Sequence, residues 1–267
     1  MTIHILIACS KSKSVLSEPN LHWNHDSSIG TWSKTWSAQD LIHEPQDLYT
    51  GRSFKQQYDL IRENENTRLY VISAGAGLIC PGDRIPSYDA TFIRNQGPST
   101  KDWYNLPKGG VGGMSLKSGD CVVSFAPPKY HKALLHDPDL HLISDLLIVP
   151  STSPLALEAK TVIEIHPRSK EVLKVSSTDL NTKFLEIFLT EGVEGFRSIN
   201  TNADSLPSLV NRTTVTDEEL HTIVGDLTKI NSNAALVRYL RDDLRIKASV
   251  ERITAARKKV NQETQDG

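Results

Sequence analysis

Cysteine is scarce in this 267-residue chain, and its three cysteines are scattered. Cys9, Cys80 and Cys121 form no CxxC pair, which excludes a zinc site built from cysteines. An odd number of widely spaced cysteines also argues against a disulfide framework. The reducing environment of the cytoplasm therefore fits this sequence best.

Long hydrophobic runs are missing as well. No apolar stretch approaches the ~18 residues that a membrane span requires. The apolar run of residues 3–8 is too short for the core of a secretory signal, and no basic segment precedes it. We therefore expect neither membrane insertion nor secretion.

The common motifs of cofactor and metal sites are also absent. The chain contains no GxxxxGK[ST] or GxGxxG phosphate loop, no HExxH helix and no GxSxG nucleophile elbow. His22, His25 and His43 are neighbours in sequence but lack the spacing of metal ligands. The sequence thus predicts no cofactor and no metal.

Basic residues are concentrated near the C-terminus, although the net charge is only -2. Between Lys229 and Val260 nine basic residues stand against three acidic ones, so this segment carries +6 and the remainder -8. Such a segment can bind a polyanion, with nucleic acid as the leading candidate, or can form the solvated face of helices. Charge alone does not choose between the two.

Apolar runs and helical periodicities alternate along the first two thirds of the chain. This alternation predicts an α/β fold with a largely parallel sheet flanked by helices. The expected strands are residues 3–8, 69–73, 121–125 and 146–149, with a further candidate at 161–165. The expected helices begin at a Ser53 cap, lie around residues 130–135, and lie at residues 180–188.

The sequence of the last third of the chain predicts a separate helical module. Residues 194–215 are rich in Asn, Ser and Thr and show no period, so we place a linker between an α/β domain at 1–193 and a basic helical module at 216–267. A capping box at Thr216 opens the module. Its segments at 233–245 and 249–260 are either a helix-turn-helix or two packed helices.

Ligands bind outside the carboxyl ends of strands in open α/β sheets, so the loops after the strands are the candidate site. The first loop contains Cys9, Ser10, Lys11 and Lys13, a set suited to phosphate. Its lysines can equally serve to solubilise an exposed turn.

The loop after residues 69–73 carries Ser73, Gly75 and Gly77, where paired glycines allow either close approach to a ligand or a tight turn. A polar stretch with Arg84 and Asp89 follows. Asp89 is a candidate general base or electrostatic stabiliser, although an Asp beside Pro and Ser is more commonly a cap.

Three of the four tryptophans lie in a polar excursion between Ser14 and Asp47. Trp23, Trp32 and Trp36 can stack on bases or sugars, or can anchor the excursion to the body of the protein.

Four linked segments, at residues 6–13, 47–54, 72–78 and 85–92, resemble the YaaA-like peroxide-stress superfamily in their residues, their order and their spacing. The resemblance covers roughly residues 1–150, including a strand at 121–125 followed by Tyr130. Many relatives carry a lysine and an aromatic residue where this chain has Gly75 and Ala76, so any role of that lysine does not carry over.

The superfamily is associated with DNA binding and oxidative DNA damage, and the chain also resembles an anti-phage DNA glycosylase that removes glucosylated hydroxymethylcytosine. The resemblance implies a pocket for a nucleobase or N-glycosidic bond. We therefore expect a monofunctional glycosylase acting on modified bases in DNA, including phage DNA.

Each task of such an enzyme has candidates. Asp89 would stabilise the sugar cation or activate water. Base and sugar would contact Tyr49, Tyr88, Ser73, Gly75, Gly77, Trp32 and Trp36; phosphate would contact Cys9, Ser10, Lys11, Lys13, Arg52, Arg84, Arg252, Arg257 and Lys258. The alternatives are a non-catalytic DNA-binding stress protein and an enzyme for a small glycoside or nucleotide.

Overall fold

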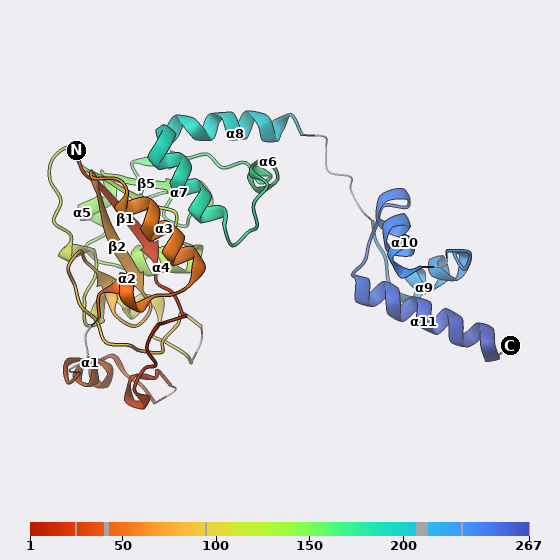
Figure 1. Cartoon of the computed structure of the whole chain (residues 1–267), viewed down its shortest axis with the longest axis horizontal. Coiled ribbons are helices and arrows are strands. Elements are labelled where there is room, and N and C mark those ends of the chain that lie inside the picture. Colours follow the sequence, from red (N-terminus) through yellow and green to blue (C-terminus); the bar gives the residue numbers. More distant parts are fainter. Residues whose placement is uncertain (25, 40–42, 94, 207–212, 231, 267) are drawn as a thin grey trace. The chain divides into compact units, whose positions relative to one another are not determined.

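The computed structural model of the protein separates into two compact units, Met1–Ser205 and Leu206–Gly267 (Figure 1). Each unit has a hydrophobic core of its own, and each is described separately. No helix among the described residues has the length and apolar character needed to cross a membrane. The structure describes residues 1–24, 26–39, 43–93, 95–206, 213–230 and 232–266.

The first unit is built around a six-stranded sheet with the strand order β3-β2-β1-β4-β5-β6. Every neighbouring pair is parallel except β2 and β3, which run antiparallel. The prediction of a largely parallel sheet is therefore confirmed. The strands are β1 Ile3–Ala8, β2 Thr67–Ser73, β3 Gly77–Ile79, β4 Cys121–Ser124, β5 Leu147–Pro150 and β6 Thr161–Ile163.

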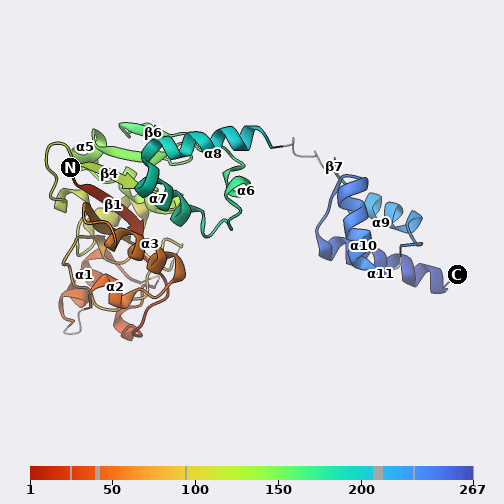
Figure 2. The same cartoon turned by 45° about the horizontal axis from the view of Figure 1, so that its top comes forward.

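Helices cover both faces of this sheet, as the alternating pattern predicts. Helices α3 and α7 contact each other on one face, while α4 and α5 lie behind the sheet in the same view (Figures 1 and 2). The helices are α1 Ile29–Ser37, α2 Pro45–Leu48, α3 Arg52–Arg62, α4 Pro128–Leu135, α5 His141–Ser144, α6 Ser169–Leu173, α7 Leu180–Glu191 and α8 Gly195–Asp204. Short 3-10 turns are η1 Pro19–Leu21, η2 Thr100–Asn105, η3 Val111–Gly113 and η4 Gly192–Glu194.

The buried residues of helix α3 share one face. Phe54, Gln57 and Ile61 are its buried side chains, at the spacing i, i+3 and i+7. The predicted cap is wrong, since Gly51 rather than Ser53 is the N-cap, and Gly51 supplies no side-chain hydrogen bond. The first amides of α3 are consequently not capped by a side chain of that residue.

Helix α8 shows that the predicted start of the linker, at residue 194, is wrong. Phe196, Ile199 and Ala203 are buried at helical spacing, so residues 195–204 belong to the first unit although their composition is polar. Ser198, Thr201 and Asn202 are among the exposed residues of this helix, and such polar residues mask its period. Of the rest of the expected linker, residues 207–212 lie outside the described residues.

The strand order identifies where a ligand should bind. From β1 the chain crosses to β2 on one side, and it later returns to β4 on the other side of β1. A crevice opens at such a reversal, outside the carboxyl ends of the two diverging strands. In Figure 1 helix α1 lies beyond these carboxyl ends.

At the opposite end of the central strands, a buried hydrogen-bond cluster around Asp120 holds the amino ends of β1 and β4 together. Its carboxylate accepts from the amides of Thr2 and Lys117 at 2.8 and 2.9 Å, and it lies 3.1 Å from Nε2 of His4. The other nitrogen of His4 lies 3.2 Å from the hydroxyl of Tyr70. These hydrogen bonds, that of the Thr2 amide foremost, hold the pKa of Asp120 well below its usual range.

We expect Asp120→Asn to weaken the acid dependence of stability. Because the folded-state pKa of Asp120 is depressed, its contribution is present above the unfolded pKa of about 4 and is lost as the pH falls toward the folded pKa. Urea denaturation at pH 7 and pH 3 should show a smaller difference for Asp120→Asn than for the unsubstituted chain. The exposed control Asp145→Asn should keep the full difference; equal differences in both variants would contradict the assignment.

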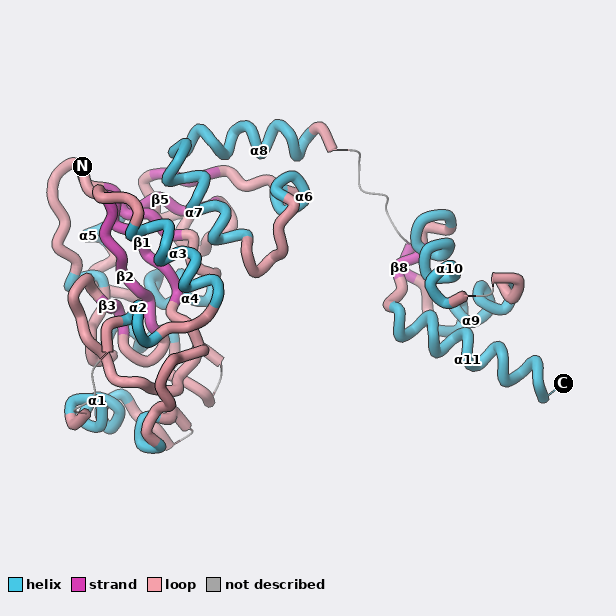
Figure 3. The backbone as a smooth tube through the Cα atoms, in the orientation of Figure 1, coloured by secondary structure: helices cyan, strands magenta, loops and turns pink. Residues whose placement is uncertain are grey.

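The second unit is a small helical module with a two-stranded parallel sheet (Figure 3). Thr216 and Glu219 form the predicted capping box, which is confirmed. The core consists of Leu220, Val224, Leu236, Leu240, Ile246, Ala248, Ile253, Ala256 and Val260. The elements are β7 Thr213–Thr214, α9 Asp217–Asp226, α10 Asn233–Arg238, a π-helical turn η5 at Tyr239–Asp243, β8 Ile246–Lys247 and α11 Val250–Asp266.

Candidate functional site

A cavity of about 600 Å³ lies at the carboxyl ends of β1 and β4, at the reversal of strand order. Its volume falls in the range of roughly 300 to 1,000 Å³ that small-molecule sites occupy. It is lined by Ala8, Cys9, Ser10, Lys11, Gly51, Arg52, Ser53, Phe54, Gln57, Pro127, Pro128, Tyr130, Ser177, Thr178 and Asn181. Four of the predicted site residues, Cys9, Ser10, Lys11 and Arg52, thus meet in one place.

Two cationic side chains and a helix N-terminus favour an anion here. Lys11 is exposed, and the side chain of Arg52 is 74% exposed at the first position of α3. Nη2 of Arg52 lies 3.4 Å from a carboxylate oxygen of Asp179, a surface ion pair that contributes little to stability. The uncapped amides of α3 add partial positive charge to the same wall of the cavity.

The close approach of this helix to the first loop requires a glycine. A Cβ on Gly51 would lie 2.1 Å from Oγ of Ser10. The same Oγ accepts a hydrogen bond from the amide of Ser12 at 3.1 Å. The side chain of Ser10 therefore joins the loop to the start of α3.

Cys9 and Tyr130 form the inner wall of the cavity. The thiol Sγ lies 3.7 Å from the Tyr130 hydroxyl, and the ring of Phe92 packs edgewise on that of Tyr130. The negative charge that Cys9 can carry, followed by burial, raises the pKa of Tyr130. Tyr130 therefore remains a neutral phenol at neutral pH and can donate a hydrogen bond to a ligand.

Behind this wall, three hydroxyl groups form a buried chain. The hydroxyls of Tyr49 and Tyr88 lie 2.7 Å apart, and that of Tyr88 lies 2.5 Å from Oγ of Ser73. Burial raises the pKa of both tyrosines well above the usual value. Tyr49 is fully buried and Tyr88 is 1% exposed. The prediction that either ring stacks on a base is therefore wrong.

Lys13 covers the ring of Tyr88. Its Nζ lies 4.4 Å from the centre of that ring and donates long hydrogen bonds to the carbonyls of Ser10 and Lys11. Burial lowers the pKa of Lys13, against the opposing effects of Cys9 and Asp89. The amine is thus partly desolvated and held against the body of the protein, unlike the exposed Lys11.

Asp89, the predicted catalytic residue, is exposed, although its neighbours Tyr88 and Ala90 are buried. Its amide donates to the carbonyl of Leu21, and its carbonyl accepts from the amide of Trp23. Its carboxylate makes no hydrogen bond or ion pair within the described ranges, but it interacts electrostatically with Lys13. Asp89 does not line the cavity between β1 and β4.

Trp32 and Trp36 anchor the excursion instead of offering stacking surfaces, so the prediction of exposed rings is wrong. They are only 3% and 8% exposed, and both rings contact that of Tyr88. Nε1 of Trp32 donates to the carbonyl of Gly75 at 2.7 Å. The excursion thereby closes over the end of β2.

The two predicted glycines serve this packing. A Cβ on Gly75 would lie 2.5 Å from the ring of Tyr88, and one on Gly77 would lie 2.4 Å from the carbonyl oxygen of Gly109. Gly77 also has φ of +98°, which disfavours other residues. Gly75, Gly77 and Ser73 are buried, so the tight-turn alternative is correct and direct contact with a base is not.

Arg84 does not line the cavity, and the remaining predicted cations belong to the second unit. Arg84 lies 3.7 Å from a carboxylate oxygen of Glu44. In the second unit, Arg252 pairs with Asp217, and Arg257 donates to Asn233 and to the carbonyl of Ile230. These arginines hold helices together, while Lys258 is exposed.

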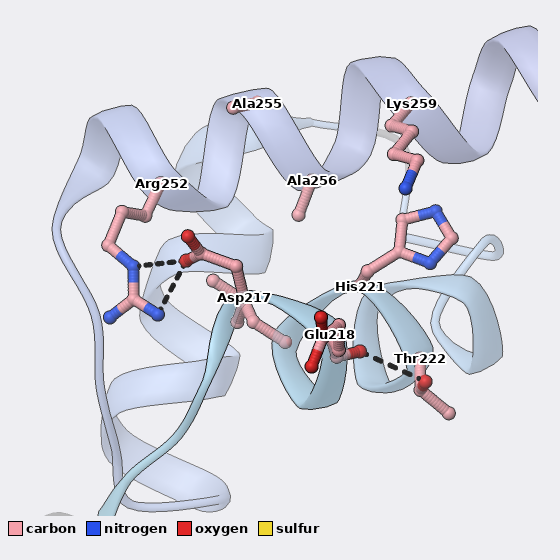
Figure 4. A pocket seen from close by; sticks show the side chains of 9 residues that line it. Asp217, Glu218, His221, Thr222, Arg252, Ala255, Ala256 and Lys259 are labelled. Carbon is pink, nitrogen blue, oxygen red and sulfur yellow. Dashed lines mark hydrogen bonds and ion pairs between the residues drawn. The ribbon is translucent and has the colours of Figure 1, made fainter.

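The second unit is less basic than its C-terminal segment suggests. Over residues 206–267 ten Lys and Arg oppose nine Asp and Glu. Three of the acids, Asp217, Glu218 and Glu219, form the first turn of α9. Asp217 and Glu218 line a pocket of about 480 Å³ between α9 and α11. Its lining mixes both signs, with Arg252 and Lys259 on the α11 side (Figure 4).

Several cavity residues carried no signal in the sequence. Gln57 is a polar residue on the buried face of α3, and Ser177, Thr178 and Asn181 come from around the start of α7. They are brought to the site by packing of α7 on α3. The one indication of these residues in the sequence was Gln57 itself, a polar residue within the apolar period of α3.

The fold and the cavity define a doubly wound α/β protein with a site at the reversal of its strand order. The model of a family described as a family of unknown function, DUF6884, matches residues 35–143. That range contains β2, β3, β4 and α4 but begins after β1. No curated protein and no solved structure matches the chain.

Proposed function

We propose that this protein is a DNA glycosylase that hydrolyses the N-glycosidic bond of modified bases, including those of phage DNA, with a role in defence against phages. The observation that carries the proposal is the cavity between β1 and β4, which combines a volume suited to one nucleotide with Lys11, Arg52 and the start of α3. The YaaA-like resemblance of residues 1–150 supports the same substrate class.

In this proposal the flipped nucleotide enters the cavity with its phosphate at Lys11, Arg52 and the first amides of α3. Tyr130 replaces the buried tyrosines and tryptophans as the aromatic contact, because it lines the cavity and is partly exposed. Its phenol would donate to the leaving base. Asp89 would stabilise the sugar cation or activate water from outside the lining of the cavity, on the side of Lys13.

The direct test is incubation of the full chain with ordinary and hypermodified phage DNA. Mass spectrometry should detect free modified base, and alkali should then cleave the DNA at the resulting abasic sites. Binding of both DNAs without release of base would instead support the non-catalytic DNA-binding alternative. If the chain neither binds these DNAs nor releases base, both the glycosylase proposal and the DNA-binding alternative are overturned.

We expect the double substitution of Lys11 and Arg52 by Ala to weaken DNA binding and to reduce its salt dependence. Each lost phosphate contact should lower the slope of log affinity against log salt by about one unit. Fluorescence anisotropy over a range of salt concentrations measures both effects. Arg62→Ala, at the exposed far end of α3, is the matched control; equal slopes for all three proteins would exclude phosphate contact by Lys11 and Arg52.

A chain ending at Ser205 should remain folded and should still release base. Its core and every residue that lines the cavity lie within Met1–Ser205. Circular dichroism and the base-release assay check the two parts of this expectation. A folded truncated chain without turnover would contradict the placement of the site in the first unit alone.

A further inference from the structure

A second cavity, of about 240 Å³, lies beside the carboxyl ends of β4, β5 and β6. Two of its lining residues, His131 and Ser153, are buried and polar, with 1% and 6% exposure. None of the candidate roles in base excision uses either of them. The cavity shares Pro128 and Asn181 with the larger one, but its polar centre is different.

His131 lies between two serines. Its Nδ1 is 2.8 Å from Oγ of Ser153, which follows β5, and its Nε2 is 2.8 Å from Oγ of Ser124, the last residue of β4. Helix α4 carries His131, so β4, α4 and the turn after β5 bring the group together.

The proton positions follow when the hydroxyl of Ser124 donates to the carbonyl of Leu6, 3.3 Å away. Its oxygen then accepts from Nε2–H of His131. Nδ1 is then the bare nitrogen, and the hydroxyl of Ser153 donates to it. Burial lowers the pKa of His131 to about 4, which keeps the ring neutral at neutral pH.

We infer that Ser153 is a nucleophile activated by His131, in a site that takes a short-chain carboxylic ester. A hydroxyl that donates to a histidine, which is itself oriented by a third group, is the arrangement of nucleophilic serine catalysis. The inference is independent of the proposed glycosylase function.

The step balances without any further reagent. Oγ of Ser153 bonds to the ester carbonyl carbon, its proton passes to Nδ1 of His131, and the alcohol leaves with that proton as its C–O bond breaks. Water then adds to the acyl-enzyme with the same base, which releases the carboxylic acid and restores Ser153.

The cavity limits the acyl group. Its volume is below the roughly 300 Å³ at which sites for drug-sized ligands begin. Ile165, Leu180 and Phe184 supply an apolar lining suited to a short alkyl chain.

A fluorophosphonate probe tests the inference on the full chain. Peptide mass spectrometry should place the adduct on Ser153, and Ser153→Ala should abolish labelling. His131→Gln should slow labelling by on the order of 10²-fold or more, since it removes the general base. Ser151→Ala, on the same turn but bonded to the amide of Ile165, should label like the unsubstituted chain.

Melting temperatures of all variants separate loss of the nucleophile from loss of the fold. Hydrolysis of p-nitrophenyl acetate and p-nitrophenyl decanoate adds a second readout, with the short ester preferred. A folded, unsubstituted chain that gains no adduct on Ser153 would overturn the inference, as would equal labelling of Ser153→Ala. Mapping on the unsubstituted chain decides the matter even if a variant does not fold.

Discussion

Replacement of Asp89 by Asn should lower the rate of base release by on the order of 10³-fold or more, with little change in folding or in DNA affinity. The substitution removes a charge but keeps the shape of the side chain. Asp89 is exposed and its carboxylate takes part in no described hydrogen bond, so its loss leaves no buried group unpaired. Its electrostatic interaction with Lys13 locates it beside the loop that follows β1.

Single-turnover rates measured with saturating enzyme isolate the chemical step of this variant from binding. Asp102→Asn provides the control, because Asp102 is an exposed acid in a later turn of the same polar region. A rate near that of the unsubstituted chain would remove Asp89 from the mechanism. Equal losses in both variants would point to a general effect of charge.

Replacement of Trp32 by Ala should lower the free energy of unfolding by about 3 to 5 kcal/mol, as for other large buried side chains. The ring of Trp32 packs against those of Trp23, Trp36 and Tyr88, and its Nε1 is bonded to Gly75. The substitution therefore opens a cavity and also leaves a buried carbonyl without its donor.

Denaturation of Trp32→Ala and Trp32→Phe separates these contributions, since Phe keeps most of the ring and loses only the donor. Folded Trp32→Ala should bind DNA with the affinity of the unsubstituted chain. Unchanged stability together with a loss of affinity of 1 to 3 kcal/mol, the amount expected for a stacked base, would restore a recognition role for the ring.

Local patterns were sufficient to predict the strands that form the middle of the sheet. Residues 3–8 are apolar and β-branched, and they form β1, whose Ile5, Leu6 and Ile7 are buried. The antiparallel β3 was missed because Gly77 opens it and suggested only a turn. Helix α1 was missed because it shows two buried tryptophans in an otherwise polar segment.

Long-range partners could not be predicted for the site. Cys9 and Tyr130 lie 121 residues apart in sequence, and the topology alone makes them neighbours. The burial of Tyr49 and Tyr88 depends on the excursion folding over β2, which no short pattern encodes. The loops after the strands were predictable as a site because parallel strands end at one edge.

The ends of the sheet in the first unit have a consequence for self-association. Its two edge strands, Gly77–Ile79 and Thr161–Ile163, are three residues long. The outer side of the first is already occupied, since the amide of Leu78 donates to the carbonyl of Gly109 and the amide of Lys108 to that of Ala76. Open edges attract strands from other chains, and short or covered edges prevent it. The loop bonded along the first edge strand and the shortness of the last strand therefore disfavour strand addition at the two borders of this apolar sheet.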